Sequence, residues 1–253
     1  MAKEKVIALF NQAGGVGKTT IALNVGYQLS RRGNKVLLID IDPQASLTLF
    51  MGIESHTLES TLFDAIINEE PLSIHTGIHG MDIAPTNINL SAAELQLVNM
   101  DFREVRLKDA IAPIKDNYDF ILIDCPPSLG LLSYISLIAA THVLVPIETH
   151  YKAFEGTNLL LQTVGRVRKK GNRSLQIAGF VPSRYAATNS QDQRTLKAIQ
   201  EQFSAIGSVY DPIPRLTAFA DASEKQVPLA VYDPKSSAVK ILDQLAAKME
   251  ELN

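Results

Sequence analysis

The sequence predicts an α/β fold in which helices flank a single doubly wound, mostly parallel sheet. Strand-like and helix-period segments alternate along the whole chain, which is typical of a parallel sheet with crossover helices. Several of the strand-like segments are uninterrupted apolar runs, as expected for strands that are buried on both faces. A glycine-rich turn also joins the first apolar segment to the first helical segment.

The first strand is expected at 6–10, directly before the glycine-rich turn. The first helix is expected at 18–32, because apolar residues recur at helical spacing within it. The other strands are expected at 35–40, 81–84, 120–124, 142–146, 175–181 and, as a short segment, near 208–210. The other helices are expected at 59–68, 90–99, 104–116, 130–140, 154–170, 190–205 and 236–251. No repeat or linker interrupts this order, so we expect one domain over residues 1–253.

The composition favours a single α/β domain without disulfides or membrane spans. At 253 residues and 46% hydrophobic content, the chain suits one large α/β domain better than two small ones. The net charge of -3 argues against a basic surface all round, although it leaves room for a local basic patch. The single cysteine, Cys125, permits no disulfide within the chain and suits a reducing cytosol. No apolar run approaches ~18 residues, so we expect no membrane span and a cytoplasmic location.

The glycine-rich turn has the composition of a phosphate cradle. Glycines let successive backbone N–H groups point at a polyphosphate, and the following helix adds the positive end of its dipole. Lys18 can then neutralise the β- and γ-phosphates, and the Thr19 hydroxyl can bind Mg²⁺. The sequence therefore predicts a nucleoside triphosphate site, and the residues of the turn are Ala13, Gly14, Gly15, Val16, Gly17, Lys18, Thr19 and Thr20.

Acidic residues follow two other expected strands, at the edge of the sheet where ligands bind in this type of fold. Asp40 and Asp42 can flank a metal-bound phosphate, one orienting Mg²⁺ and the other orienting or deprotonating the attacking water. Asp124 ends the apolar segment 120–124, which is the Walker B arrangement. Either segment alone is weak evidence for a site that binds a metal-bound phosphate, because acidic residues often end strands. The occurrence of both, in this order after the glycine-rich turn, is strong evidence for such a site.

Together these segments resemble the ParA/MinD group of deviant Walker ATPases, which are P-loop NTPases, over essentially the whole chain. The resemblance implies a sandwich dimer that forms when ATP binds and separates after hydrolysis. It also implies non-specific binding of nucleoid DNA by the dimer, and a partner protein that stimulates hydrolysis. The matching segments are 14–20, 40–44, 124–127, Pro146 with Tyr151, 155–156, 213–215 and 232–234.

By motif position, the resemblance assigns Lys18 and Thr19 to the phosphates and Mg²⁺ and Asp42 to the hydrolytic water. It assigns Asp40 and Asp124 to support of the metal. Gln44, the last residue of the segment 40–44, is assigned to the nucleotide-binding residues. Two further segments resemble the adenine side of the family's site, and they contain Arg184 and Pro214. These two could equally be loop residues with a structural role.

The chain departs from the family pattern at Ala13, where the group carries a lysine that reaches the partner's phosphates. Lys152 stands where relatives usually carry a small residue, on the ligand-bearing edge of the sheet. We hypothesise that Lys152 replaces the missing lysine; the alternative is an ordinary surface lysine. In this departure the chain resembles the McdA branch of the group, whose members distribute carboxysomes over the nucleoid with a small partner, McdB.

The DNA contacts are expected at a basic patch, because the chain as a whole is not basic. Arg194, Lys197 and Arg215 lie nearest to positions that resemble the family's DNA-contacting region. Contacts of this kind go to phosphates, so binding should be independent of base sequence and sensitive to salt. Dimerisation would double the patch and couple DNA affinity to the bound nucleotide.

Several other functions remain to be weighed. Chromosome or plasmid partitioning differs from carboxysome positioning only in its cargo. A metabolic ATP-dependent ligase on the same fold is a more distant alternative, and it would turn over briskly with a small acceptor. A membrane role is less favoured because the end of the chain, 241–253, lacks the basic and bulky apolar face of a membrane-surface helix. A single cysteine does not suit an iron–sulfur carrier.

Overall fold

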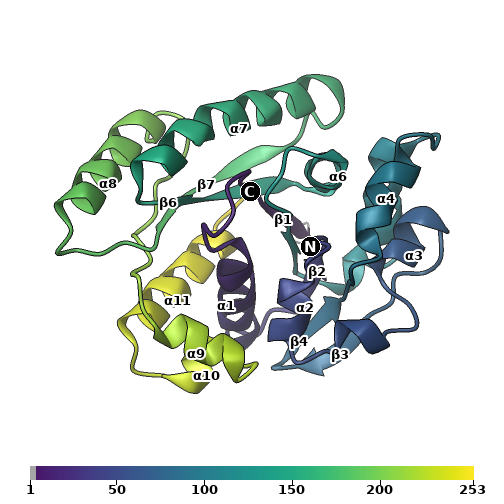
Figure 1. The fold of residues 1–253 in the computed structure, drawn as a ribbon, viewed down its shortest axis with the longest axis horizontal. Helices are drawn as coiled ribbons and strands as arrows, with labels where there is room; N and C mark the ends of the chain where they lie inside the picture. Colours follow the sequence, from purple (N-terminus) through teal and green to yellow (C-terminus); the bar gives the residue numbers. More distant parts are fainter. Residues whose placement is uncertain (1–3) are drawn as a thin grey trace.

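The structure, a computed structural model, describes residues 4–253 except for the side chains of residues 151–155, and it has helices on both faces of a seven-stranded sheet (Figure 1). The predicted fold class is therefore confirmed. The strands are β1 (Lys5–Leu9), β2 (Val36–Asp40), β3 (His75–Ile78), β4 (Met81–Ala84), β5 (Phe120–Asp124), β6 (His142–Glu148) and β7 (Gln176–Ser183). The α-helices are α1 (Lys18–Arg31), α2 (Ser46–Phe50), α3 (Leu62–Ile67), α4 (Leu90–Leu97), α5 (Arg106–Ile111), α6 (Leu131–Ala139), α7 (Tyr151–Lys170), α8 (Ser190–Phe203), α9 (Ala218–Glu224), α10 (Leu229–Tyr232) and α11 (Ser237–Glu250).

The strand order is β3-β4-β2-β5-β1-β6-β7, and every neighbouring pair is parallel except β3 with β4. Strand β1 lies near the centre, so the loop that follows it emerges in the middle of the carboxyl edge. Asp124 at the end of β5 is the register partner both of Leu9 in β1 and of Asp40 in β2. The ends of three adjacent strands thus bring the glycine-rich loop and two acidic residues together.

Two hydrophobic cores lie on opposite faces of the sheet, because the side chains of each central strand alternate between them. On one face, alternate residues of the strands pack against helices α3 to α8. On the other face they pack against α1, α2 and α9 to α11. Figure 1 shows α7 and α8 beyond one side of the sheet and α1, α9, α10 and α11 beyond the other.

Some expected elements differ from the structure. The strand expected near 208–210 is wrong, because Val209 makes only an isolated bridge to Phe180. The helix expected at 104–116 is shorter in the structure: it contains α5, Arg106–Ile111, with short 3₁₀ turns at Arg103–Val105 and Lys115–Asn117. Strand β3 and helices α2, α9 and α10 were not expected. They have only four to seven residues, too few to show a clear period.

Candidate nucleotide-binding site

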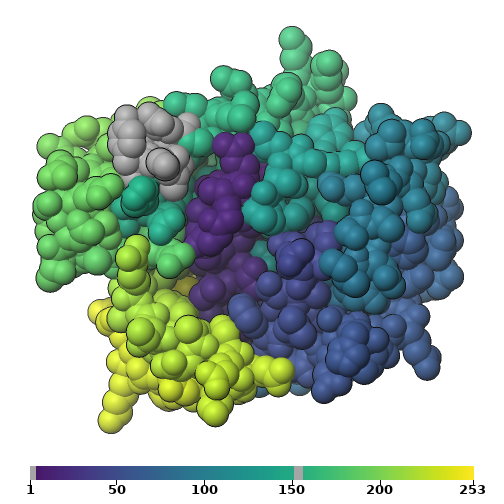
Figure 2. Space-filling model, viewed as in Figure 1, coloured from purple at the N-terminus to yellow at the C-terminus, as the bar shows by residue number. Residues whose placement is uncertain are grey.

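The loop between β1 and α1 takes a shape that requires glycine. Gly15 (φ 75°) and Gly17 (φ 88°) both have left-handed backbone conformations, which side chains other than glycine rarely adopt. Asn11 fixes the start of the loop: its Nδ2 donates to the carbonyl of Pro146 at 2.6 Å, and its Oδ1 accepts from the Ala13 N–H at 2.9 Å. The loop is therefore tied to the end of β6, with Gly14 and Gly15 exposed. Figure 2 shows this N-terminal segment at the centre of one face of the molecule.

Lys18, the first residue of α1, points its ammonium group back into the loop. Its Nζ donates to the carbonyls of Asn11 at 2.9 Å and Ala13 at 3.0 Å, and the residue is only 6% exposed. Burial lowers the pKa of Lys18, while the neighbouring carboxylate of Asp124 acts in the opposite direction. An ammonium group held in this way can exchange its carbonyl partners for phosphate oxygens. Its position suits the predicted contact with the β- and γ-phosphates.

The side chains predicted to support a metal ion meet beside the loop. The Thr19 hydroxyl donates to Oδ2 of Asp124 at 2.6 Å. The second oxygen of that carboxylate, Oδ1, is buried and has no hydrogen-bond partner among the described residues. A buried carboxylate oxygen without a donor is costly unless a cation or water satisfies it. The hydroxyl and the carboxylates are the hard oxygen ligands that Mg²⁺ prefers, so this group of residues fits the ion.

Asp40 is held rigidly within the same cluster. Its Oδ2 accepts from both the backbone N–H and the hydroxyl of Thr48 at 2.8 Å, and its Oδ1 accepts from the Asp42 N–H at 3.2 Å. Burial raises the pKa of Asp40 to about 7, and it also raises the pKa of Asp124 well above its usual range. Two buried carboxylates side by side therefore create a demand for positive charge, which Mg²⁺ would supply.

Asp42 and Gln44 lie just beyond β2, at the mouth of the site. Asp42 is half-buried, and its Oδ1 accepts from the backbone N–H of Gln44 at 3.0 Å. Gln44 itself is exposed. Asp42 is thus the more accessible of the two acids that follow β2, since Asp40 is fully buried. This difference favours Asp42 for contact with water and Asp40 for support of the metal.

A cavity of about 550 Å³ opens next to the loop. Its walls are the start of α1, the end of β7, the segment 213–216 and helix α9, and it is more apolar than polar in character. Gly15, Gly17 and Thr20 line its phosphate side, while Phe50, Ile213, Pro214, Leu216 and Phe219 supply apolar surface. Size, apolar walls and contact with the glycine-rich loop suit a nucleoside base and ribose. Pro214 and Arg184, the two residues expected on the base side, both line this cavity.

Glu148, at the end of β6, joins two arginines at the rim of the cavity. Its Oε1 lies 3.5 Å from Nε of Arg184 and 3.6 Å from Nη2 of Arg215. Arg184 has a left-handed backbone (φ 53°), and its Nη1 donates to the carbonyl of Gly15 at 3.1 Å. Arg184 therefore contacts the phosphate loop, and both arginines line the base cavity.

The basic residues expected to contact DNA do not all lie together. Arg215 lines the nucleotide cavity, whereas Arg194 and Lys197 project from α8 and do not line it. Lys197 also forms an ion pair with Glu201, one turn further along α8, at 3.7 Å. The hypothesis for Lys152 concerns a side chain that lies outside the described residues, although its backbone belongs to the first turn of α7.

Four polar residues of the site were not predicted from the sequence: Asn11, Thr48, Glu148 and Ser183. Asn11 and Glu148 end or directly follow buried strands at the ligand edge, so their position was a usable signal. Ser183 ends β7, and its hydroxyl donates to the carbonyl of Val16 at 2.8 Å. Thr48 belongs to α2, a five-residue helix without a sequence signal, and only the fold brings it to Asp40.

Comparison with known proteins agrees with this geometry. The family described as AAA domain matches residues 4–177. The chromosome partitioning protein ParA of Caulobacter vibrioides is 37% identical over 251 residues, covering 97% of this chain and 93% of that protein. Among solved structures, cobyrinic acid a,c-diamide synthase of Mycobacterium smegmatis with ADP and magnesium has a TM-score of 0.87 at 29% identity, covering 98% of this chain and 94% of that one. The apo McdA structure from Cyanothece has a TM-score of 0.88 at 25% identity, covering 97% and 99%.

The Mycobacterium structure contains ADP and magnesium. The chain belongs to the ParA/MinD group of P-loop ATPases within the AAA domain family.

Proposed function

We propose that this chain is a positioning ATPase, which converts ATP and water to ADP and phosphate and in doing so times its attachment to DNA. It forms a sandwich dimer with ATP, binds nucleoid DNA without base specificity, and releases it when a cargo-bound partner stimulates hydrolysis. The observation that carries this proposal is the assembly of Lys18, Thr19 and three strand-end aspartates around one glycine-rich loop, beside a cavity of nucleotide size. The 37% identity to a chromosome partitioning protein supports it.

The roles within one site follow from the positions of the side chains. Lys18 binds the terminal phosphates, and the loop N–H groups surround them. Thr19 and Asp124 hold Mg²⁺ with the support of Asp40. The ion neutralises charge on the phosphate oxygens when it is bound. Asp42, the accessible acid, orients the attacking water, and it needs no strong basicity because phosphoryl transfer depends mainly on positioning and charge.

We further propose that Lys152 supplies the cation that Ala13 cannot. Two hydrogen bonds fasten the phosphate loop to the segment around Lys152: Asn11 Nδ2 donates to the carbonyl of Pro146 at 2.6 Å, and Gln12 Nε2 donates to the carbonyl of Gly156 at 3.0 Å. The backbone of residues 146–156 therefore runs beside the loop that would face the second protomer. We infer from this that Lys152 reaches across a sandwich interface to the partner's phosphates.

For DNA we retain Arg194, Lys197 and Arg215 as candidate contacts, with Arg215 also close to the nucleotide. A cytoplasmic, nucleoid-associated location follows from this proposal. No helix of the described residues is long and apolar enough to cross a membrane.

The cargo has two candidates. The replacement at Ala13 and Lys152 favours carboxysomes, with an McdB-like adaptor, and the Cyanothece McdA structure has the same fold at 25% identity. The Caulobacter relative favours a second candidate, chromosome or plasmid partitioning, because it is more similar in sequence and bears that name. A fluorescent fusion distinguishes the two when it is observed together with labelled carboxysomes and a labelled replication origin. Deletion of the gene should disturb the spacing of only the true cargo.

The ATPase rate tests the function itself. We expect slow hydrolysis by the protein alone, and faster hydrolysis with plasmid DNA and the partner. The similarity to a diamide synthase structure, at 29% identity, gives the ligase alternative its one specific support. Brisk turnover that depends on a small carboxylate and an amine donor would contradict our proposal. Asp42→Ala should abolish hydrolysis yet keep ATP binding, and in cells it should hold a fluorescent fusion on the nucleoid.

A further inference from the structure

Glu148, the last residue of β6, lies between two arginines and has no part in the proposed mechanism of hydrolysis. Its Oε1 is 3.5 Å from Nε of Arg184 and 3.6 Å from Nη2 of Arg215, and its side chain is only 23% exposed. No other carboxylate of the described residues lies within ion-pair distance of either arginine. One largely buried acid is therefore shared by two cations at the carboxyl edge of the sheet.

Backbone pairing brings these three side chains together. Glu148 is the register partner of Ser183 in β7, and Arg184 directly follows that serine. The N–H of Arg215 donates to the carbonyl of Tyr185 at 2.9 Å, which holds its segment alongside the end of β7. The fold itself thus brings one carboxylate and two guanidinium groups to the same place.

Arg184 reaches from this cluster to the phosphate loop. Its Nη1 donates to the carbonyl of Gly15 at 3.1 Å, and the hydroxyl of the preceding residue, Ser183, donates to the carbonyl of Val16 at 2.8 Å. Two successive carbonyl groups of the loop are therefore held by two successive residues at the end of β7. Arg184 also has a left-handed backbone (φ 53°), which is uncommon outside glycine and persists only where the surrounding contacts maintain it.

These contacts determine which way the peptide groups of the loop face. A trans peptide is planar, so its carbonyl and the N–H of the next residue point in opposite directions. The carbonyl of Gly15 points at Arg184, so the N–H of Val16 points away from β7. The carbonyl of Val16 points at Ser183, and the N–H of Gly17 points away in the same manner. Neither N–H has a hydrogen-bond partner among the described residues, which leaves both for phosphate oxygens.

We propose that Glu148 is a positioning residue of the nucleotide site. It holds the guanidinium group of Arg184 against the carbonyl of Gly15, and so keeps the loop N–H groups turned toward the phosphates before a nucleotide binds. The inference rests on the nucleotide site of the proposed function, and it requires neither DNA, nor a dimer, nor a cargo. A loop that is already in its binding conformation loses less entropy when ATP or ADP binds.

The sign of the effect separates this role from simple electrostatics. Loss of the Glu148 carboxylate leaves Arg184 and Arg215 without their counter-charge, and charge alone would then strengthen the binding of a polyphosphate. Positioning predicts weaker binding instead, because an arginine without its partner no longer stays at Gly15. The two arginine side chains are 49% and 55% exposed, and physiological salt screens exposed charges beyond about 8 Å. The contact with Gly15 is local, so we expect positioning to prevail.

The test measures the affinity of the full chain for fluorescent ATP and ADP with Mg²⁺, at physiological salt and at severalfold higher salt. Glu148→Gln keeps the shape of the side chain and removes its charge, and it should weaken both nucleotides roughly threefold at either salt concentration. Arg184→Ala should weaken both roughly tenfold, because it removes the charge-assisted hydrogen bond to the loop. Adding Glu148→Gln to Arg184→Ala should have no further effect, whereas adding it to Arg215→Ala should still weaken binding roughly threefold.

Two further measurements exclude a merely structural role for Glu148. Adenosine, titrated in competition with the fluorescent nucleotide, carries no phosphate, so its affinity should be the same for Glu148→Gln and the wild type. In the ATPase assay, KM should rise while kcat stays the same, as expected when an interaction common to the ground state and the transition state is lost. Glu250→Gln is the matched control, because it removes another partly buried carboxylate that pairs with an arginine, Arg32, at 2.9 Å. It should leave the affinity for nucleotides unchanged.

Each outcome supports or contradicts a stated claim. An affinity for ATP that is unchanged or higher in Glu148→Gln would overturn the proposal, and so would an equal loss of adenosine binding. An effect of Glu148→Gln that persists in the Arg184→Ala background would show that Glu148 does not act through Arg184, which also overturns it. If the wild type binds nucleotides as described but ignores DNA and partner proteins, the proposed function fails while the role of Glu148 stands. If the wild type binds neither ATP nor ADP, both fail.

Discussion

Asp40 and Asp124 are register partners at the ends of β2 and β5, so two buried carboxylates lie side by side beside the phosphate loop. Asp40 has its donors from Thr48 and Asp42, whereas Asp124 has Thr19 on one oxygen and no partner among the described residues on the other. Burial raises the pKa of both groups, and a neighbouring carboxylate acts in the same direction: Asp42 on Asp40, and Asp40 on Asp124. The site is thus electrostatically strained in a way that a divalent cation relieves.

This strain predicts opposite effects of Asp124→Asn on the free protein and on the complex. Replacing one carboxylate with an amide removes the repulsion, so the unfolding temperature of the free protein should stay the same or rise by a few degrees. The increase in unfolding temperature that Mg²⁺ and ATP produce should be much smaller in the variant, because the ion loses a charged ligand. Thermal unfolding with and without Mg²⁺ and ATP measures both effects.

The exposed carboxylate of Asp116 provides the control, since Asp116→Asn should alter neither quantity. A variant Asp124→Asn that was strongly destabilised without ligand would show that the carboxylate supports the fold rather than the ion.

Lys152→Ala should weaken dimerisation with ATP if this lysine replaces the one missing at Ala13. A charged contact to phosphate contributes roughly 1.5–3 kcal/mol, so the dimer dissociation constant should rise tenfold or more. Light scattering in the Asp42→Ala background, with Mg²⁺ and ATP, measures it. Lys169→Ala, at the other end of α7, is the matched control and should dimerise like the parent. Normal dimerisation of Lys152→Ala would leave the interface without its proposed cation.

Phe219→Ala should weaken the binding of ATP and ADP by the same factor. Phe219 lines the apolar part of the nucleotide cavity, which Lys18 does not line. Its removal should therefore eliminate a contact with the base and leave the contacts with the phosphates intact. Loss of an aromatic contact of about 1 kcal/mol corresponds to roughly a fivefold weaker affinity. Titration with fluorescent ATP and ADP measures both constants. Phe102→Ala removes a phenylalanine that is 80% exposed and should have no effect. A change confined to ATP would place Phe219 near the γ-phosphate instead.

The phosphate side of the site could be predicted from the sequence because short local motifs specify it. Asp40 and Asp124 end strands that can be recognised from their apolar runs, Asp42 lies two residues beyond the first of them, and neighbouring parallel strands end at one edge of the sheet. The position of Lys18 follows in the same way from a glycine-rich turn and the helix after it. These relationships need no knowledge of which strand lies beside which.

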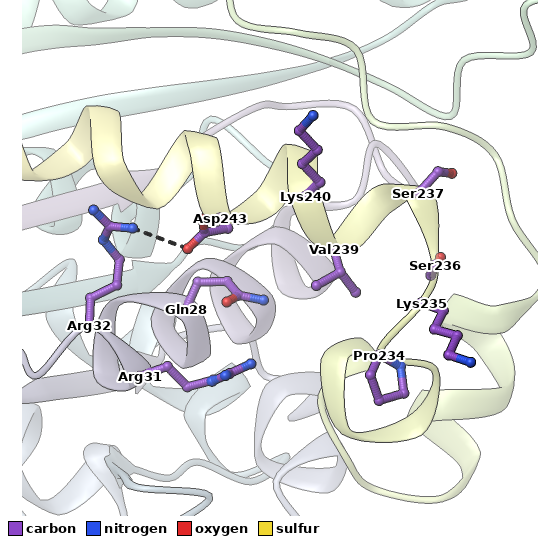
Figure 3. Close-up of a pocket in the computed structure, with 10 residues that line it drawn as sticks. All are labelled: Gln28, Arg31, Arg32, Pro234, Lys235, Ser236, Ser237, Val239, Lys240 and Asp243. Atoms are coloured by element: carbon purple, nitrogen blue, oxygen red, sulfur yellow. Dashed lines mark hydrogen bonds and ion pairs between the residues drawn. The ribbon is translucent and has the colours of Figure 1, made fainter.

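Neither the base side of the site nor the pocket between the end of α1 and the start of α11 could be predicted in this way. The base cavity needs α9 and the segment 213–216 to fold back over α1, which depends on tertiary packing. Arg31 and Lys235 line the pocket between α1 and α11 although they are far apart in sequence (Figure 3). The basic residues of 235–240 are visible in the sequence, but only the packing of α1 against α11 brings them to the same pocket as two arginines.

The stability of the fold should fall below neutral pH through His142, at the amino end of β6. Its side chain is 4% exposed, Nδ1 lies 2.9 Å from the Thr141 hydroxyl, and burial lowers its pKa below the usual 6.5. The unfolded chain therefore takes up a proton at a higher pH than the folded protein does. The stability that the neutral ring contributes is complete above about pH 6.5 and is lost as the pH falls toward the lower pKa of the folded state.

Urea unfolding of the wild-type protein and His142→Asn, at intervals between pH 5 and 8, measures this contribution as the difference between the two proteins at each pH. The difference isolates His142 from other groups, above all from Asp40, whose raised pKa has the opposite sign and lowers stability as the pH rises through about 7. Because asparagine does not titrate in this range, the variant should lose less stability than the wild type between pH 7 and 5. Parallel curves for the two proteins would mean that the folded protein accommodates a charged ring at this position, for example by a movement of Lys5, whose charge helps to lower the pKa of His142.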